Sequence, residues 1–321
     1  RRPKLGCLAP ETLSYLRNMY RLFFLPVVCG VVLSPLKGRN KPQCGSSHPD
    51  GRAVGNFSDG RNDRCFSVVT PADAPHPMPV VFWFHGAKGN AKDCGASGPG
   101  SEMGALAVKH GFALVCGEGV QGIFGPGGQW DIPEVITDST GTPCSPEDST
   151  EIVYFNEILK SLSEHPDTYD VNRLYFSGCS MGAGMSQYLG VCTKKAAPSV
   201  VSAFATHSTG LKIKDDGLMW RPDNHQPQYF WSECPRCKYY PQKVEKYDDP
   251  VGLKACVFDN KQDPDDRDPF FYKSSVQLAE AWGAVGNRVE THWGQGGHCE
   301  FESFEAVVQC LDDGTGELVR K

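Results

Sequence analysis

The 321-residue sequence has no apolar run of the length that usually crosses a membrane. The apolar run at residues 22–33 has 12 residues, whereas a helical span needs about 20. Positive charge is not in excess, because the formal net charge is −6, and this argues against a nucleic-acid partner. Internal repeats and low-complexity tracts are also missing, which excludes solenoid and fibrous architectures.

The N-terminal residues 1–37 have the pattern of a leader. A basic stretch precedes the short apolar run, as in a secretory signal peptide. We expect translation to start at Met19 and cleavage to fall between Gly30 and Gly38. A membrane anchor or a buried helix is the alternative interpretation. The leader holds six basic residues and one acidic residue, so the remaining chain would have a net charge of −11 and no attraction to anionic polymers or lipid.

Cysteine is abundant, and its number indicates an oxidising compartment. The chain has 14 cysteines, of which Cys7 and Cys29 lie in the expected leader. The remaining twelve form an even set, as in a disulfide framework. The sequon Asn56-Phe57-Ser58 adds an acceptor for N-glycosylation. These features predict a secreted glycoprotein with no stable membrane association after the leader is removed.

Cys234-Pro235-Arg236-Cys237 is a single C-x-x-C motif. A zinc site needs a second pair of ligands, and no other cysteine pair or histidine has the matching spacing. A structural disulfide is therefore the preferred interpretation, and we predict no metal site. A thiol-redox protein that uses this motif or Cys179 is an alternative, which complete pairing of the cysteines would exclude.

Strand-like and helical patterns alternate along the chain. Apolar runs of strand length occur at 78–84, 112–116, 171–176, 200–205, 253–258 and 288–293. Helical spacing of apolar residues occurs at 102–110, 149–164, 181–191, 272–282 and 301–311. This alternation predicts an α/β fold with a mainly parallel sheet. We interpret 120–147 as a glycine- and proline-rich loop and 212–250 as an insertion, so that residues 38–321 form one domain.

Gly178-Cys179-Ser180-Met181-Gly182 is a G-x-S-x-G pentapeptide between an expected strand and an expected helix. A sharp turn of this kind lifts a serine oxygen clear of the backbone, and the flanking glycines relieve crowding. The first N–H groups of the helix then face developing negative charge. Ser180 is the candidate nucleophile, and a structural glycine–serine turn is the alternative.

A serine nucleophile needs a base, and in α/β-hydrolases the chain order is Ser, acid, His. His298 lies in a Gly-Gly loop after the last expected strand, where the base belongs. The acid should follow the strand at 253–258, where the candidates are Asp259, Asp263, Asp265, Asp266 and Asp268. Asp263 lies in the turn and is preferred, with Asp259 next. Its role would be to orient the imidazole of His298.

An oxyanion hole needs two backbone N–H groups aimed at the reacting carbonyl oxygen. Met181, the residue after the nucleophile, supplies one of them. The segment Phe84-His85-Gly86-Ala87-Lys88-Gly89 follows an early strand and supplies the other, which we assign to Ala87. A glycine-rich turn without a role is the alternative interpretation.

With these residues placed, the chain resembles secreted esterases of the feruloyl esterase and polyhydroxybutyrate depolymerase-like group. The resemblance covers about residues 43–311 and includes the segments 82–90 and 178–182 and the Gly297-His298 pair. It implies an α/β-hydrolase fold, with a doubly wound sheet and helices on both faces. The group commonly has His-Gly-x-x-Asp before the acid, of which this chain keeps only the final aspartate, Asp263.

The Cys179-Ser180 and His298-Cys299 pairs resemble fungal tannase and feruloyl esterase relatives, in which the neighbours of Ser and His are disulfide-linked. This resemblance implies a Cys179–Cys299 bond, which would stabilise the fold by about 4–5 kcal/mol in the entropic treatment. Trp130 resembles the aromatic subsite residue of such esterases and would stack on an acyl or aromatic group, with a surface or core tryptophan as the alternative. Gly86, in the loop after the early strand, is a further candidate for substrate binding. Those relatives carry a lid domain for which this chain has no room.

The sequence as a whole predicts a secreted carboxylic ester hydrolase without a cofactor. Its substrate would be a small or polymeric ester of aryl, feruloyl, acetyl or polyester type. A serine peptidase or thioesterase on the same fold is one alternative. A non-catalytic binding protein with the same fold is another, against which the intact Ser180 and His298 argue.

Overall fold

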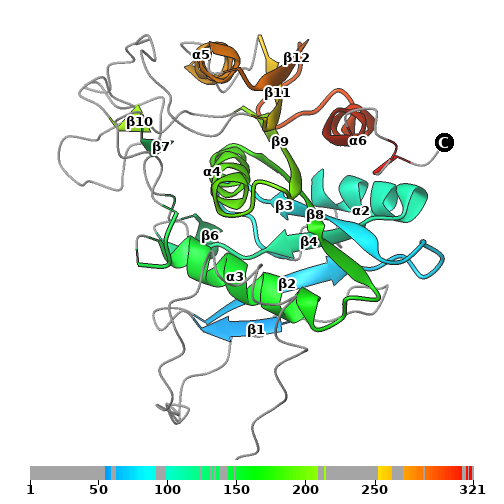
Figure 1. Cartoon of the computed structure of the whole chain (residues 1–321). Coiled ribbons are helices and arrows are strands. Elements are labelled where there is room, and N and C mark those ends of the chain that lie inside the picture. Colours follow the sequence, from blue (N-terminus) through cyan, green and yellow to red (C-terminus); the bar gives the residue numbers. More distant parts are fainter. Residues whose placement is uncertain are drawn as a thin grey trace, which may run out of the picture.

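The computed structural model shows one large sheet with helices on both of its faces (Figure 1). The residues that it describes are 55–58, 63–91, 99–122, 125–130, 132, 135–136, 144–147, 149–208, 213–214, 252–261, 270–284, 286–312, 316 and 318–319.

The main sheet has eight strands in the order β1-β2-β4-β3-β8-β9-β11-β12. β2 pairs antiparallel with both of its neighbours, and every pair from β4 to β12 is parallel. The strands are β1 (Gly55–Ser58), β2 (Asp63–Val69), β3 (Met78–Phe84), β4 (Ala113–Gly117), β8 (Tyr169–Cys179), β9 (Val201–His207), β11 (Lys254–Asn260) and β12 (Arg288–Gly294).

Five helices within the described residues cover the two faces of this sheet. They are α2 (Pro99–His110), α3 (Thr150–Ser163), α4 (Met181–Ala196), α5 (Phe270–Ala284) and α6 (Phe304–Asp312). In Figure 1, α2 and α6 lie together on one face, and α3, α4 and α5 lie on the opposite face. Parallel strands joined by helices require this two-sided cover, because both faces of the sheet are apolar.

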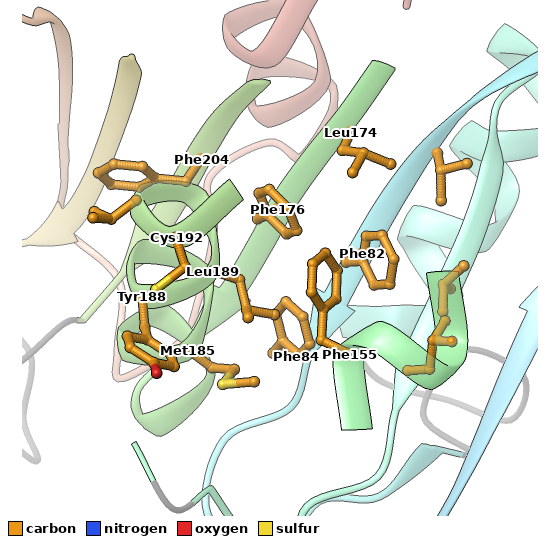
Figure 2. Packing of buried hydrophobic residues seen from close by; sticks show 14 of the residues in the cluster. Phe82, Phe84, Phe155, Leu174, Phe176, Met185, Tyr188, Leu189, Cys192 and Phe204 are labelled. Carbon is orange, nitrogen blue, oxygen red and sulfur yellow. The ribbon is translucent and has the colours of Figure 1, made fainter. Parts of the chain in front are cut away.

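The core beneath α3, α4 and α5 is built around aromatic residues of the central strands. Phe82 of β3 packs on Phe176 of β8 and on Phe155 of α3, with ring centroids 5.5 and 5.3 Å apart. Figure 2 shows these rings beside Met185 and Leu189 of α4. Burying this helix face against the sheet holds the N-terminus of α4 at the end of β8.

The core on the other face packs α2 and α6 against the alternate residues of the same strands. Trp83 of β3 contacts Phe301 and Phe304, with ring centroids 5.9 and 5.7 Å apart. The Cys256–Cys310 disulfide also joins β11 to α6. These contacts hold the segment between β12 and α6, which contains His298, close to the sheet.

The predicted fold class is confirmed, because the sheet is mainly parallel and has helices on both faces. The predicted loop at 120–147 is wrong in part. β5 (Val120–Gly122) and β6 (Gly125–Gln129) form an antiparallel pair, and β7 (Val135–Ile136) pairs with β10 (Ile213–Lys214). Glycine-rich segments have low strand propensity, but backbone pairing overrides it here.

Several predictions concern residues that the structure does not describe. The leader at 1–37, Asp263, the C-x-x-C motif at 234–237 and all of the insertion at 212–250 except β10 belong to this group. Among the described residues, no helix is both long and apolar enough to span a membrane.

Candidate active site

The carboxyl ends of the parallel strands meet at one edge of the sheet. Ligands of open α/β sheets bind outside this edge. The segments that follow β3, β8 and β9 begin there with His85, Ser180 and Ser208. The segment after β12 returns there with Gly297 and His298, because Asn260 at the end of β11 hydrogen-bonds to it. Ser180 and His298, far apart in the sequence, therefore belong to the same edge.

Ser180 occupies a strand-to-helix turn that only glycine neighbours allow. A Cβ atom on Gly178 would lie 2.6 Å from the carbonyl oxygen of Phe84, and one on Gly182 would overlap that same oxygen. Real Cβ atoms do not come so close to backbone, so both positions need glycine. The end of β8 at Gly178 and the first turn of α4 at Gly182 can thus press against the end of β3.

Positive φ angles concentrate around this turn. The four non-glycine residues with positive φ in the described ranges are Lys88, Ser180, Ser208 and Cys299. Each follows the carboxyl end of a strand or adjoins His298. A bulky or β-branched residue is rare in such a conformation, and strain of this kind accumulates at functional sites. Among the described residues, unusual backbone conformations therefore lie close to Ser180 and His298, which the sequence predicts to be catalytic.

The structure joins Cys179 to Cys299 by a disulfide across 120 residues of sequence, with Cα atoms 5.5 Å apart. The sulfur atoms of both cysteines and a ring nitrogen of His298 all lie within 4.8 Å of one another. The imidazole of His298 thus reaches the residue that precedes Ser180. It also packs on Phe271 of α5, with ring centroids 4.4 Å apart.

The loop after β3 is held by the side chain of His85. Nδ1 of His85 lies 2.7 Å from the carbonyl oxygen of Gly86, and Nε2 lies 3.1 Å from the N–H of Gly119. Since the Gly119 amide can only donate, Nε2 accepts and Nδ1 carries the proton. Burial lowers the pKa of His85 to about 4, so this neutral tautomer persists at neutral pH.

This hydrogen bond also sets the direction of the Ala87 N–H group. The carbonyl of Gly86 points at His85 and accepts a second bond, 3.1 Å long, from Gly89. Because a peptide unit is planar and trans, the N–H of Ala87 points the opposite way. A Cβ on Gly86 would lie 3.5 Å from Cβ of Ser180, so the loop is in contact with the candidate nucleophile.

Met181 is the first residue of α4, and the first N–H groups of a helix have no acceptor within the helix. Its N–H is therefore suited to an anion beside Ser180. Ser180, Met181, Ala87 and His298 are all partly exposed, whereas His85 is buried. The groups expected to react are open to solvent, and the group that positions them is not.

Trp130 does not fit its expected role as a substrate-stacking residue. Its side chain is 2% exposed and its indole N–H donates a 2.9 Å hydrogen bond to the carbonyl oxygen of His85. The indole packs on Phe84 and on the imidazole of His85, with ring centroids 5.2 and 4.8 Å apart. Trp130 therefore supports the 85–89 loop from beneath, because the β5–β6 pair turns it toward the core.

Asp259, the second choice for the acid, is buried at the end of β11. One carboxylate oxygen accepts the N–H of Asn260 at 2.7 Å, and the other accepts the hydroxyl of Ser275 in α5. These two bonds hold the carboxylate against α5 and the end of β11. Asp263, the first choice, lies outside the described residues.

Three buried polar residues at this edge, His207, Ser208 and Asn260, were not among the site residues predicted from the sequence. Each is at most 1% exposed, and each ends a buried strand or directly follows one. Their position was a usable signal, because polar residues directly after buried parallel strands face the edge where sites form. They connect the turn at Ser180 with the loop that carries His298.

Comparison with known proteins supports the fold. No protein-family model matches the chain, and a search of curated proteins finds no match. Among solved structures, the acetyl xylan esterase from Aspergillus awamori is 15% identical, with a TM-score of 0.53 over 81% of this chain and 99% of that chain. A ferulic acid esterase is 15% identical, with a TM-score of 0.51 over 83% and 97%.

A thermostable carboxylesterase cloned from a metagenomic library is a third similar structure. It is 14% identical, with a TM-score of 0.50 over 84% of this chain and 88% of that chain. Identity this low establishes the architecture alone. The chain has the α/β-hydrolase fold, as its sheet order and its strand-to-helix turn at Ser180 indicate.

The glycine requirement at the turn predicts opposite effects of two Gly→Ala substitutions. Gly182→Ala should lower the free energy of unfolding by more than about 3 kcal/mol, because the new methyl group meets the carbonyl of Phe84. Gly283→Ala, in α5, should raise it by about 0.5–1 kcal/mol, because its methyl group lies 4.0 Å from Val289 and alanine favours a helix. Urea denaturation measures both. Equal effects of the two substitutions would show that the turn is not tightly packed.

Two of the buried histidines, His85 and His207, predict that acid destabilises the fold. Burial lowers the pKa of His85 to about 4 and, with the nearby His298, that of His207 to about 3, against 6.5 when unfolded. As pH falls below 6.5, the unfolded chain binds protons that the folded chain does not. Stability should therefore fall by about 2 kcal/mol per histidine between pH 7 and pH 5.

Denaturant unfolding at these two pH values measures the loss. The window lies above the ordinary carboxyl pKa values, so histidines dominate it. His85→Asn, which keeps a donor near the position of Nδ1, should reduce the loss by about half of its wild-type value. A wild-type stability that does not change between pH 7 and pH 5 would contradict neutral burial of these side chains.

Proposed function

We propose that the chain is a serine carboxylic ester hydrolase. Ser180 is the nucleophile, His298 the general base and acid, and Asp263 the group that orients the imidazole. The N–H groups of Ala87 and Met181 form the oxyanion hole. The substrates are aryl, feruloyl, acetyl or polyester-type esters.

One observation carries this proposal. Ser180 lies in a strained turn, with φ 56° and ψ −120°, against the Gly86 loop. The Cys179–Cys299 bond brings the segment of His298 to the same turn, with its ring nitrogen within 4.8 Å of both sulfurs. A serine held in this way, with N–H donors and an imidazole beside it, is the arrangement that acyl transfer requires.

The reaction follows from these roles. Oγ of Ser180 attacks the ester carbonyl carbon and its proton passes to His298, while the carbonyl π electrons move onto the oxygen facing Ala87 and Met181. The tetrahedral intermediate then expels the alcohol, which takes the proton from His298. Water repeats the sequence on the acyl-enzyme and releases the acid. Each step uses protein groups and water, so the proposal includes no cofactor.

Asp263 is the proposed acid, with Asp259 as the second choice. The carboxylate oxygens of Asp259 already accept hydrogen bonds from Asn260 and Ser275, which orient that side chain toward α5. In the sequence, Asp263 lies four residues after Asp259 and is the preferred acid. Its role would be to favour one tautomer of His298 and to stabilise the imidazolium.

The ester class is supported by the similar structures. Three similar structures with TM-scores of 0.50 or more are a ferulic acid esterase, an acetyl xylan esterase and a carboxylesterase. Their shared chemistry is hydrolysis of a carboxylic ester, and the acyl and alcohol groups differ among them. The cleaved bond, a carboxylic ester, is therefore specified more closely than the acyl and alcohol groups of the substrate.

Secretion is part of the same proposal. The leader-like pattern at 1–37 and the abundance of cysteine support it. All seven cysteines whose side chains the structure describes, including Cys116, Cys144 and Cys192, are in disulfides, which persist in oxidising compartments. N-glycosylation at Asn56, in β1, belongs to this proposal. The acidic mature chain is not expected to bind nucleic acid or to remain on membranes.

Substitution of the proposed triad tests the mechanism. Ser180→Ala should lower kcat on nitrophenyl acetate by at least about 10⁴-fold, because the residual rate then comes only from binding and the oxyanion hole. Asp263→Asn should lower kcat/KM by about 10³–10⁴-fold, and Asp259→Asn should instead mainly lower stability. Steady-state kinetics on methyl ferulate, acetylated xylan and polyhydroxybutyrate then defines the ester class.

Two controls make these results interpretable. Ser186→Ala removes a buried hydroxyl that donates within α4, 2.9 Å from the carbonyl oxygen of Gly182, and should leave kcat within about 3-fold of wild type. Circular dichroism checks that each variant is folded. Full activity of folded Ser180→Ala protein would defeat the proposed function.

A further inference from the structure

Asn260 at the end of β11 holds the turn that carries His298. The side chain is 1% exposed, and its Nδ2 donates to the carbonyl oxygens of Gly297 at 2.8 Å and Glu300 at 2.9 Å. Both acceptors are carbonyls, so the amide group must present its NH₂ side. The two bonds lie on either side of His298 and Cys299, and they use both amide protons.

The turn itself is closed by local bonds and is fastened to the sheet by Asn260. The N–H of Glu300 donates to the carbonyl of Gly297 at 3.1 Å, and the Glu300 carboxylate accepts the N–H of Gly297 at 2.8 Å. These bonds give the turn a fixed shape. The bonds from Asn260 give that shape a fixed place on the sheet.

The glycines before His298 make room for this amide. A Cβ on Gly294 would overlap Oδ1 of Asn260, and one on Gly296 would lie 3.1 Å from Nδ2. The side chain of Asn260 therefore fits only because both positions lack a Cβ atom, and this requirement is separate from turn formation. The Gly-Gln-Gly-Gly-His segment and Asn260 are thus complementary parts of one arrangement.

The same buried network reaches the turn of Ser180. The carbonyl oxygen of His207 accepts the N–H of Ser180 at 2.9 Å, and Oγ of Ser208 accepts the N–H of Cys299 at 3.3 Å. His207 also hydrogen-bonds to the backbone of Glu300, and Asn260 lies 3.5 Å from its Nε2. One connected set of side chains therefore touches the segments of both proposed catalytic residues.

We propose that Asn260 is a positioning residue for His298, whose carboxamide places the imidazole at Ser180 by holding the carbonyls of Gly297 and Glu300. This inference rests on the proposed function and adds to it a residue outside the triad. His207 supports it by remaining neutral, since a second cation beside His298 would oppose formation of the imidazolium. The Cys179–Cys299 bond links the two segments, and Asn260 sets their geometry.

Asn260→Asp is the sharpest test, because it keeps the shape of the side chain and replaces the two donors by an acceptor. The carboxylate then faces two carbonyl oxygens and repels them. In the full-length protein, kcat on nitrophenyl acetate should fall about 100-fold with KM within about 3-fold, as expected for a displaced catalytic group.

Asn287→Asp is the matched control. Asn287 directly precedes β12, at the end of the β11–β12 pair that lies opposite Asn260. Its side chain is 7% exposed, and its Oδ1 accepts the N–H of Leu253 at 3.2 Å. An aspartate keeps that acceptor, and Nδ2 of Asn287 has no hydrogen-bond partner among the described residues. Both variants bury a new carboxylate, but only Asn260→Asp should lower kcat. A kcat of folded Asn260→Asp within 3-fold of wild type would overturn the inference.

Two NMR measurements separate this inference from the proposed function. The ring resonances of His298 should shift in Asn260→Asp and not in Asn287→Asp, whatever reaction the protein catalyses. In the wild-type protein, both side-chain amide protons of Asn260 should exchange with solvent at least about 1,000-fold more slowly than those of an exposed asparagine. Unchanged His298 resonances in folded Asn260→Asp would refute the positioning role. Fast exchange of the Asn260 amide protons in the wild-type protein would also refute it, and this second measurement does not require Asn260→Asp to fold.

Discussion

The carbonyl oxygen of Phe84, at the end of β3, lies against both glycines of the pentapeptide. This close approach determines where α4 can begin, and α4 in turn carries Met181 at its first position. The next residues along the chain from Phe84 form the loop in contact with Ser180. The proposed nucleophile and the proposed oxyanion donors are therefore placed by one steric contact between two neighbouring strands.

Support for this contact comes from residues that do not face solvent. His85 and Trp130 hold the loop after β3, and His207, Ser208 and Asn260 hold the segments of Ser180 and His298. Positive φ at Ser180, Ser208 and Cys299 costs of order 1–3 kcal/mol each, which the hydrogen bonds and the Cys179–Cys299 bond offset. The partly exposed groups are thus oriented by a buried frame, which is what an active site requires.

The sequence predicted the fold and the outline of the site because both depend on local patterns. Continuous apolar runs such as 78–84 mark buried parallel strands, and the pentapeptide marks the turn that follows one of them. The start of α6 differed from the expected residue 301. Ser303 caps the helix by accepting the N–H of Ala306, so the helix begins at Phe304.

Features that depend on distant partners were not readable in the same way. The paired strands of 120–129 have glycine-rich sequences, and the direction of Trp130 follows from that pairing. The role of Asn260 depends on carbonyl groups 37 and 40 residues later, which no local pattern indicates. Contacts between residues far apart in the sequence were thus the part of the site that the sequence did not indicate.

The central claim is that a reactive Ser180 is covalently tied to the segment of His298. The protein can be labelled with a fluorophosphonate, digested without reduction and analysed by mass spectrometry. We expect one species in which the peptide of Cys179 and Ser180 carries the label on Ser180 and is disulfide-bonded to the peptide of His298 and Cys299. A label on another residue, or labelled Ser180 peptide not linked to Cys299, would contradict it.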